Sequence, residues 1–259
     1  MASPRSIFNA TITFGLVNVP IKLHTATDNK TVRFREVHET DGAPLEHRRL
    51  DPETGEKVEY ADVVKGFEIG EDEYVVLTKE EVKAAAGERT KTIPIEEFVP
   101  AHDIDPVFFS KTYYVGPREG GEAAYKALQT ALEETGRAGI GRMTFHDREY
   151  LVAVRALDGV LGLHQLRFAD EVATEKELEL NEPGRGPSDR EVKMAGALVD
   201  SLETKWTPDE YEDTYRERVV EMIEAKAKGK QVVRPKEEEP AEESDLLAAL
   251  EASLKGMKS

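Results

Sequence analysis

The residues of this sequence that could do chemistry are basic ones gathered between positions 28 and 70. Guanidinium and ammonium groups bind phosphate oxygens through charge-assisted hydrogen bonds, whatever the nucleotide sequence. Arg33 and Arg35 alternate with two apolar residues, which predicts that both guanidinium groups lie on one face of a strand. The alternative is a solvated hairpin with ordinary surface arginines. The candidate phosphate-binding residues are Lys30, Arg33, Arg35, His47, Arg48, Arg49 and Lys65.

Catalysis is not predicted. The sequence holds none of the motifs GxxxxGK[ST], GxGxxG, GxSxG or HExxH, and no pair of carboxylates at catalytic spacing. It has no cysteine, which excludes disulfides, thiolate metal sites and cysteine catalysis. The six histidines never fall at metal-ligand spacing; they are His24, His38, His47, His102, His146 and His164. We therefore expect a binding protein without catalytic, metal or cofactor sites.

The net charge of −17, from 35 Lys and Arg against 52 Asp and Glu, counts at first sight against a nucleic-acid partner. The charge is unevenly distributed, however. Residues 1–70 hold nine basic and 11 acidic residues, so most of the excess acid lies after residue 70. A nearly neutral segment can present basic side chains on one face, while the acidic remainder repels a polyanion.

The first element that must position the basic residues is the stretch from Ser6 to Thr27. Its alternating residue pattern predicts two β-strands. Gly15 is expected at a bend or bulge and Pro20 at a strand edge or break, as in a strand that turns a corner of a closed barrel. An ordinary hairpin in any α+β protein is the alternative. In the basic segment, Asp51 to Gly55 predicts a tight turn.

Later segments add strands and helices. A capping box at Thr78 and Glu81 predicts a helix that ends near Gly87, and Glu119 to Thr135 predicts a longer one. Tyr113 and Tyr114 are adjacent in a predicted strand, so one is expected in the core and the other at an edge. This interpretation is favoured over the alternative that they stack on nucleic-acid bases. Nine extended segments before residue 170 indicate a barrel with an extended arm. Beyond the first hairpin and the arm, they include residues 73–78, 91–100, 105–117, 138–146, 149–157 and 160–168.

Residues 170–187 predict a linker, and capping boxes at Ser188–Glu191 and Thr207–Glu210 predict two helices after it. The second helix is expected from Pro208 to about Lys228. Residues 230–243 predict disorder, and residues 244–256 predict a short amphipathic helix. The apolar residues expected to pack on the barrel or on a partner subunit are Trp206, Tyr211, Tyr215, Val219, Met222 and Ile223, with Leu198 and Leu202 on the first helix.

The run ITFGLVNVPIKL, residues 12–23, closely resembles the opening motif of the bacterial Ku proteins. VVKGFEI, residues 63–69, and WTPDEYEDTYRERV, residues 206–219, resemble later motifs of that family, although Trp206 and Val219 depart from its pattern. The resemblance covers about residues 6–229. It implies a ring-shaped homodimer that threads onto double-stranded DNA ends in non-homologous end joining, with residues 28–70 as a strap over the DNA. DPETG stands where some members carry CxxC.

We therefore expect a mainly β, α+β fold, with a barrel core in residues 1–170, a linker and C-terminal helical arm in 171–229, and an acidic tail in 230–259. The expected function is sequence-independent binding of double-stranded DNA ends as a homodimer that recruits the bacterial end-joining DNA ligase. The alternative is an acidic β-barrel adaptor that binds proteins and never DNA. No apolar run long enough to span a membrane and no signal peptide is seen, so we expect a cytoplasmic, nucleoid-associated protein.

Overall fold

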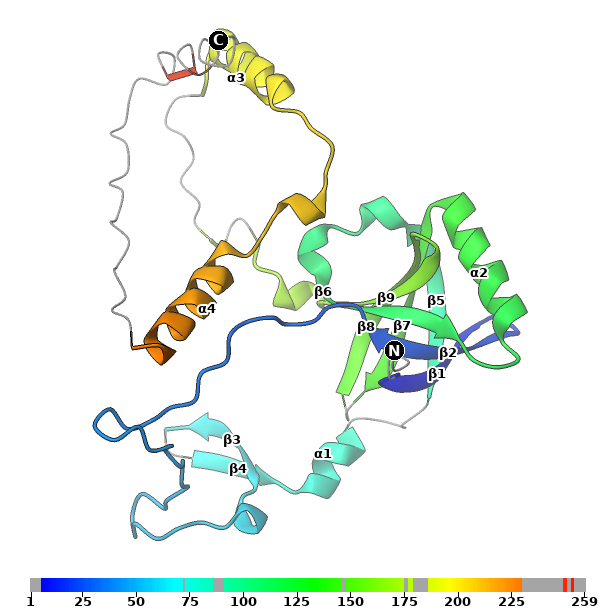
Figure 1. Ribbon diagram of the computed structural model, residues 1–259. Helices are drawn as coiled ribbons and strands as arrows, with labels where there is room; N and C mark the ends of the chain where they lie inside the picture. The colour runs from blue at the N-terminus through cyan, green and yellow to red at the C-terminus, as the bar shows by residue number, and fades with distance from the viewer. Residues whose placement is uncertain are drawn as a thin grey trace. The chain divides into compact units, whose positions relative to one another are not determined.

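The computed structural model describes residues 6–71, 73–85, 91–145, 148–174, 177–178 and 186–229, with three further residues at 249, 250 and 253. The chain divides into two compact units (Figure 1). The first comprises Met1–Asn29 and Arg35–Leu178, and the second comprises Lys30–Phe34 and Glu179–Ser259.

Seven strands of the first unit form a closed barrel, which confirms the predicted fold class (Figure 1). Their order is β1-β2-β6-β9-β8-β7-β5. Neighbours are antiparallel, except β5 and β1, which pair in parallel and close the barrel. The strands are β1 (Phe8–Phe14), β2 (Val17–Thr25), β5 (Thr92–Pro100), β6 (Phe109–Pro117), β7 (Arg137–Phe145), β8 (Arg148–Leu157) and β9 (Val160–Leu166).

Apolar residues that alternate along the strands fill the interior of the barrel. Ile12 of β1, Ile21 of β2 and Leu163 of β9 are fully buried there. Side chains in a strand point to the two faces in turn, so the residues between them face outward. Tyr113 is buried and Tyr114 is exposed, as expected for one core and one edge residue.

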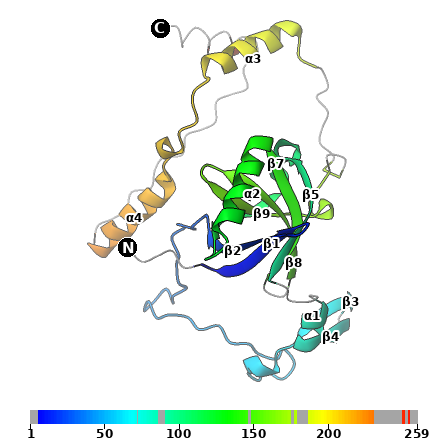
Figure 2. The ribbon, with the colours of Figure 1, turned by 90° about the vertical axis from the view of Figure 1, so that its right-hand side faces the viewer.

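The helix α2 (Glu122–Thr135) packs against the barrel and ends at Gly136, whose φ is 63° (Figure 2). Its Tyr125 hydroxyl donates to the Val115 carbonyl at 2.7 Å and accepts from the Leu161 N–H at 2.9 Å. Both groups lie on barrel strands, so this hydroxyl joins the helix to β6 and β9. Burial raises the pKa of Tyr125 above its ordinary value.

β1 and β2 form a tight hairpin, so the predicted strand that turns a corner is wrong. Phe14 pairs with Val17 across a two-residue turn. Gly15 lies in that turn with φ of 55°, a conformation that side chains with a Cβ disfavour. The glycine therefore reverses the chain and makes no bulge.

Pro20 lies inside β2, opposite Thr11, so the predicted break is wrong, whereas the alternative of a strand edge agrees with its place just outside the β2–β6 pairing. Its carbonyl faces the β6 side, where it accepts from the Arg118 N–H at 3.0 Å. The missing N–H of the proline faces the same side. Pairing between β2 and β6 reaches only Ile21 and Pro117, so no strand hydrogen bond is lost at position 20.

Residues 27–64 form a largely irregular arm. The turn predicted at Asp51 to Gly55 is confirmed, because the Asp51 carboxylate accepts from the N–H groups of Glu53 and Thr54 at 2.8 and 3.1 Å. β3 (Lys65–Gly70) and β4 (Glu73–Leu77) follow as a separate two-stranded sheet.

The helix α1 (Lys79–Ala85) comes next. Its predicted capping box is confirmed, since the Thr78 N–H donates to the Glu81 carboxylate at 2.8 Å and the Glu81 N–H to the Thr78 hydroxyl at 3.2 Å. Within the described residues, the short 3-10 helices are Tyr60–Asp62, Ala101–Asp103, Pro106–Phe108, Ala169–Glu171 and Pro208–Glu210.

The second unit contains α3 (Asp189–Ser201) and α4 (Thr214–Ala227). The capping box at Ser188 and Glu191 is confirmed. The second helix starts later than predicted, because only one 3-10 turn forms at Pro208 and Asp213 then caps α4 by accepting from the Arg216 N–H at 3.0 Å. Trp206 and Tyr211 therefore lie outside both α-helices, and Leu202 follows the last residue of α3.

Several predictions fall outside the described residues. They are the end of the first helix near Gly87, residues 175–176 and 179–185 of the linker, and the tail from residue 230, of which only residues 249, 250 and 253 are described.

Candidate nucleic-acid interface

The predicted phosphate-binding residues are all exposed; six of them lie on irregular backbone, and Lys65 is the first residue of β3. Lys30 and Arg33 belong to the second unit, and the other five belong to the first. The prediction that Arg33 and Arg35 lie side by side on a strand is wrong, since no strand forms between residues 26 and 36. The apolar neighbour Phe34 is itself 70 % exposed, so no buried face fixes the alternation.

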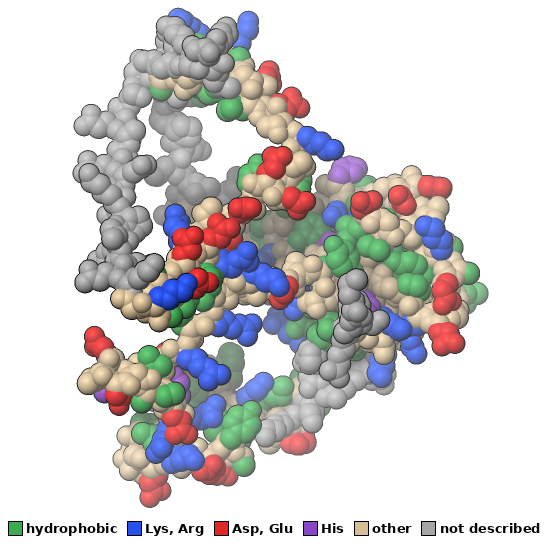
Figure 3. Space-filling view, viewed as in Figure 1, with side chains coloured by type: hydrophobic (Ala, Val, Ile, Leu, Met, Phe, Trp, Pro, Cys, Tyr) green, Lys and Arg blue, Asp and Glu red, His purple; other side chains and the backbone are tan. Residues whose placement is uncertain are grey.

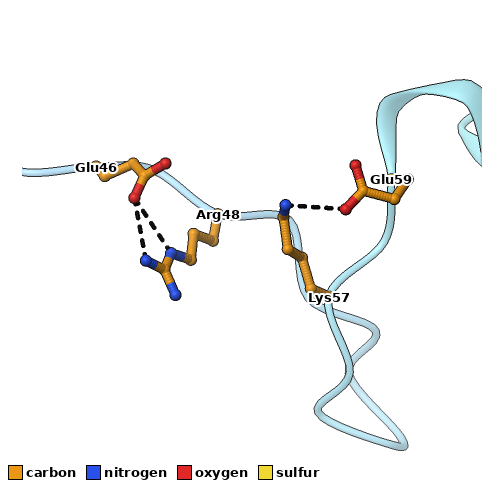
Figure 4. Close-up of polar contacts among 4 residues, drawn as sticks. All are labelled: Glu46, Arg48, Lys57 and Glu59. Carbon is orange, nitrogen blue, oxygen red and sulfur yellow. Dashed lines mark hydrogen bonds and ion pairs between the residues drawn. The ribbon is translucent and has the colours of Figure 1, made fainter.

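Two of these residues are bound to carboxylates within the arm. Arg48 donates twice to Glu46, at 3.1 and 3.3 Å, and His47 contacts Glu36 at 2.7 Å. Figure 4 shows the Arg48 pair beside a similar pair of Lys57 with Glu59. Exposed ion pairs of this kind contribute little free energy, about 0–1 kcal/mol, so a phosphate can compete for the arginine.

Three other predicted residues, two in the arm and one at the start of β3, have no such partner among the described residues. In the described part of the chain, Arg33, Arg35 and Lys65 form no ion pair with a carboxylate. The Arg49 guanidinium lies over the ring of Tyr60, 5.3 Å from its centre. An arginine that stacks on an aromatic ring keeps its N–H donors for a phosphate. Figure 3 shows blue basic side chains on the arm with red acidic ones between them.

A second basic surface, which the sequence patterns did not single out, lies on the barrel wall. His24 of β2 pairs with Tyr114 of β6, Tyr114 with Gly162 of β9, and Gly162 with Arg155 of β8. Paired residues point to the same side of a sheet, and this row alternates with the buried residues, so it faces outward. Lys22 lies two residues before His24 on the same face and is exposed.

Three of the four strands that carry this row, and β1 beside them, hold no acid, whereas β8 carries Glu149. β1, β2, β6 and β9 are consecutive around the barrel and have seven, nine, nine and seven residues, none of them Asp or Glu. One residue in five of the whole chain is acidic, 52 of 259. The acid-free segments can be read in the sequence, but only the strand order brings them together as one wall.

Arg155 is held by its neighbours on this wall. Its Nε donates to His164 Nε2 at 3.2 Å, and its guanidinium lies 5.6 Å from the centre of the Phe109 ring. His164 Nδ1 lies 2.9 Å from the Thr112 hydroxyl. Burial, with the nearby Arg155 charge, lowers the pKa of His164 to about 4. The imidazole is therefore neutral at physiological pH.

Apolar side chains are exposed on the β3–β4 hairpin and in the second unit. On the hairpin they include Phe67 and Tyr74, 68 % and 56 % exposed, and every residue of both strands is exposed. Trp206 stacks on Tyr211, with ring centres 5.0 Å apart, yet both rings are about 70 % exposed. Of the remaining predicted packing residues, Leu202, Tyr215, Met222 and Ile223 are exposed, and Leu198 and Val219 are half-buried.

No three His, Asp or Glu side chains of the described ranges come together as a metal site requires. Where the structure describes helices, none has the length and apolar character needed to cross a membrane.

Comparisons with known proteins point to one family. The profile of the Ku70/Ku80 beta-barrel domain matches residues 13–194. The non-homologous end joining protein Ku of Anaeromyxobacter sp. is 41 % identical over 252 residues, which are 96 % of this chain and 85 % of that protein. The protein of the same name from Archaeoglobus fulgidus is 36 % identical over 98 % of this chain and its own full length. That from Mycobacterium tuberculosis is 35 % identical, over 97 % of this chain and 95 % of its own.

Proposed function

The chain belongs to the Ku family, and we propose that it binds double-stranded DNA ends in non-homologous end joining. The observation that carries the proposal is the similarity over nearly the whole chain to proteins named for that process. A match confined to the barrel would support the fold alone, whereas this one also includes the arm and the C-terminal helices.

Binding without sequence preference follows from the kind of contact available. The arm offers arginine and lysine side chains on irregular backbone, and these groups contact phosphates and not base edges. Within the described residues, no helix carries a row of basic residues suited to the major groove. A preference for ends then comes from topology, because a closed ring admits a duplex only through its end.

A homodimer supplies the ring in this proposal, and the exposed apolar surfaces support it. A two-stranded sheet alone in water is marginally stable, and β3–β4 exposes apolar residues on both faces. Phe67 and Ile69 alternate with Gly66 and Glu68, while Tyr74 and Val76 face opposite to Val75. Contact with a second copy would remove these side chains from water and order the hairpin.

The C-terminal helices serve the same dimer. Trp206, Tyr211 and Tyr215 expose large rings in an otherwise charged segment, and monomeric soluble proteins rarely leave such groups uncovered together. We assign residues 171–229 to a linker and C-terminal helical segment that packs on a barrel, and the tail from residue 230 to a separate, dispensable segment.

The partners beyond DNA and a second copy are inferred from the family alone. The protein acts without catalysis, in the cytoplasm at the nucleoid, and presents the DNA end to the bacterial end-joining ligase. In this proposal phosphate contacts come from Lys30, Arg33, Arg35, Arg48 and Arg49 of the arm, with His47 beside them, and from Lys65 at the start of β3.

A topology experiment tests the proposal. Binding of the full chain to linear duplex is compared with binding to covalently closed circles of the same sequence, at two salt concentrations. Preference for the linear form, weakening as salt rises, is the expected result. Equal affinity for both forms would end the threading mechanism. No binding to either form would favour an acidic adaptor that contacts only proteins.

A further inference from the structure

An apolar groove beside the helix α2 has no place in the function proposed above. It has a volume of about 490 Å³ and is lined by residues of α2 and of the barrel strands β1, β2, β5 and β7. Eight of the ten lining residues are apolar, among them Phe14, Val17 and Phe98 of the strands and Leu128 and Leu132 of α2. Val17 and Phe98 are exposed. The groove is therefore suited to bind an apolar group that removes these side chains from water.

The shape of the groove is set by contacts within the barrel and by small residues of the helix. The Phe14 and Phe98 rings meet edge to face, with their centres 6.0 Å apart. Ala124, Ala127 and Ala131 recur at helical spacing, so they line the same side of α2. Their methyl groups leave open the space that larger side chains would fill. Because the groove is already formed, binding there requires little rearrangement.

One end of the groove carries a positive charge. Arg137 follows Gly136, the residue that ends α2, and lines the groove. Among the described residues it forms no ion pair with a carboxylate, unlike Arg142 on the same strand. Glu133 and Asp158 line a second cavity with Arg137 but form no ion pair with it in that part of the chain. The groove thus favours an apolar partner with a carboxylate at its edge.

The chain has a segment of this chemistry at residues 244–256, which the proposed function does not use. A helix there would place its four leucines on one side, and Glu251 would lie beside them, four residues after the second leucine and three before the last. The structure describes residues 249, 250 and 253 of the segment, and they are helical. So short a helix is marginal alone and needs a surface that covers its apolar side. The leucines are Leu246, Leu247, Leu250 and Leu254.

The volume of the groove and the length of the connecting chain agree with this occupant. An apolar cavity of about 150 Å³ holds one benzene-sized group, so the groove has room for about three leucine side chains. Residues 230–243 connect the segment to the end of the helical part, and a chain of this length spans up to about 50 Å. A globular unit with as many residues as the first unit is about 40 Å across. The connection is therefore long enough.

The size of the groove favours a tethered segment over a separate molecule. Ten residues line the groove, whereas a stable interface between two proteins uses about 20–30 residues a side. A short flexible linker raises the effective concentration of an attached segment into the millimolar range, so few contacts suffice.

We propose that residues 244–256 bind in the groove beside α2 of the same chain, as a helix whose leucines face the groove and whose Glu251 pairs with Arg137. The inference goes beyond the proposed function, because this contact requires no DNA. While it lasts, it covers both the groove and the leucines, so neither can bind a helix of another protein. A partner with a similar leucine stripe therefore has to displace this segment first.

Disulfide cross-linking of the full chain tests the contact, because the chain has no cysteine of its own. Ala127→Cys is combined with Leu250→Cys, which keeps three of the leucines, and oxidised glutathione is added. The intrachain disulfide is followed by non-reducing electrophoresis. Lys126→Cys with Leu250→Cys is the matched control, since Lys126 is exposed on α2 but does not line the groove. The groove pair should cross-link at least about tenfold faster than the control pair.

Charge reversal tests the ion pair. Arg137→Glu or Glu251→Arg, each added to the groove pair of cysteines, should slow cross-linking several-fold, and the two together should restore most of the rate. Lys255→Glu is the control, because Lys255 lies on the side of the predicted helix away from the leucines, and it should leave the rate unchanged. Thermal unfolding of each reduced variant verifies that the barrel is intact.

Equal rates for the groove and control pairs would overturn binding of the segment in the groove. Disulfides that link two chains, at a rate that rises with protein concentration, would overturn the same-chain contact and assign the segment to a second copy. Unchanged rates in both single charge variants would overturn the pairing of Arg137 with Glu251. None of these measurements involves DNA, so their results are independent of whether the chain binds DNA ends.

Discussion

Acidification should destabilise the barrel through His164 in particular. In the unfolded chain an imidazole has a pKa near 6.5, whereas burial and the Arg155 charge lower the pKa of the folded His164 to about 4. Between these values the unfolded chain takes up a proton that the folded chain refuses. Stability therefore falls as pH decreases from about 6.5 to about 4, and no further loss from this residue follows below that.

The magnitude follows from the two pKa values. Each unit of pKa difference corresponds to about 1.4 kcal/mol, so the full loss is at most about 3.5 kcal/mol, most of it present by pH 4.5. His164 is only 5 % exposed, so solvent screening reduces this figure little. A loss of this size is a large part of the stability of an ordinary domain.

Urea unfolding at pH 7.0, 6.0, 5.0 and 4.5 measures the effect. Carboxylates also titrate in this range, so the quantity to follow is the difference between the unmodified protein and His164→Gln, which lacks the imidazole. The variant should be less sensitive to acid by about 2–3 kcal/mol between pH 7.0 and 4.5. His102→Gln, at an exposed histidine of the same unit, is the control for removing any imidazole. Parallel pH profiles for the unmodified protein and the position 164 variant would refute the reasoning.

Three further predictions concern the arm, the helix and the C-terminus. The double variant Arg33→Glu, Arg35→Glu should abolish duplex binding without unfolding the protein, since both positions are exposed. Each lost phosphate contact should lower the slope of log K against log salt by about one. Unchanged binding in a filter or anisotropy assay would exclude this part of the arm as a DNA-contacting surface. Tyr125→Phe should cost about 1–3 kcal/mol in chemical unfolding, because the Leu161 N–H and Val115 carbonyl lose their partner, and a smaller loss would mean that water replaces the hydroxyl. Truncation after Gly229 should leave a dimer that binds DNA ends, whereas truncation before Thr207 should give an unstable or monomeric protein. In sedimentation experiments, a stable end-binding dimer from the shorter chain would exclude the structural role of the helices, and a monomer from the longer chain would show that the tail is needed.

The sequence by itself determined the local features of the fold. Alternation of apolar residues predicted the barrel strands, and short hydrogen-bonding motifs predicted the capping boxes at Thr78 and Ser188, because both depend only on residues close along the chain. Local pattern failed where two local structures compete. Thr207 to Glu210 has the residue types of a capping box, yet the chain makes one 3-10 turn there, and α4 starts at Thr214 after the cap residue Asp213.

The two basic surfaces, on the arm and on the barrel wall, differ in whether the sequence alone reveals them. The arginines of the arm stand out in the sequence because they are neighbours along the chain. The barrel wall does not, because Lys22, Tyr114 and Arg155 lie on three strands that only the order β2-β6-β9-β8 brings side by side. The pairing of Arg155 with His164 depends on strand register, and a slip of one residue would point one of them into the core. Composition thus determined which groups are available to bind a polyanion, and the tertiary structure decided which of them are held together and which are already neutralised.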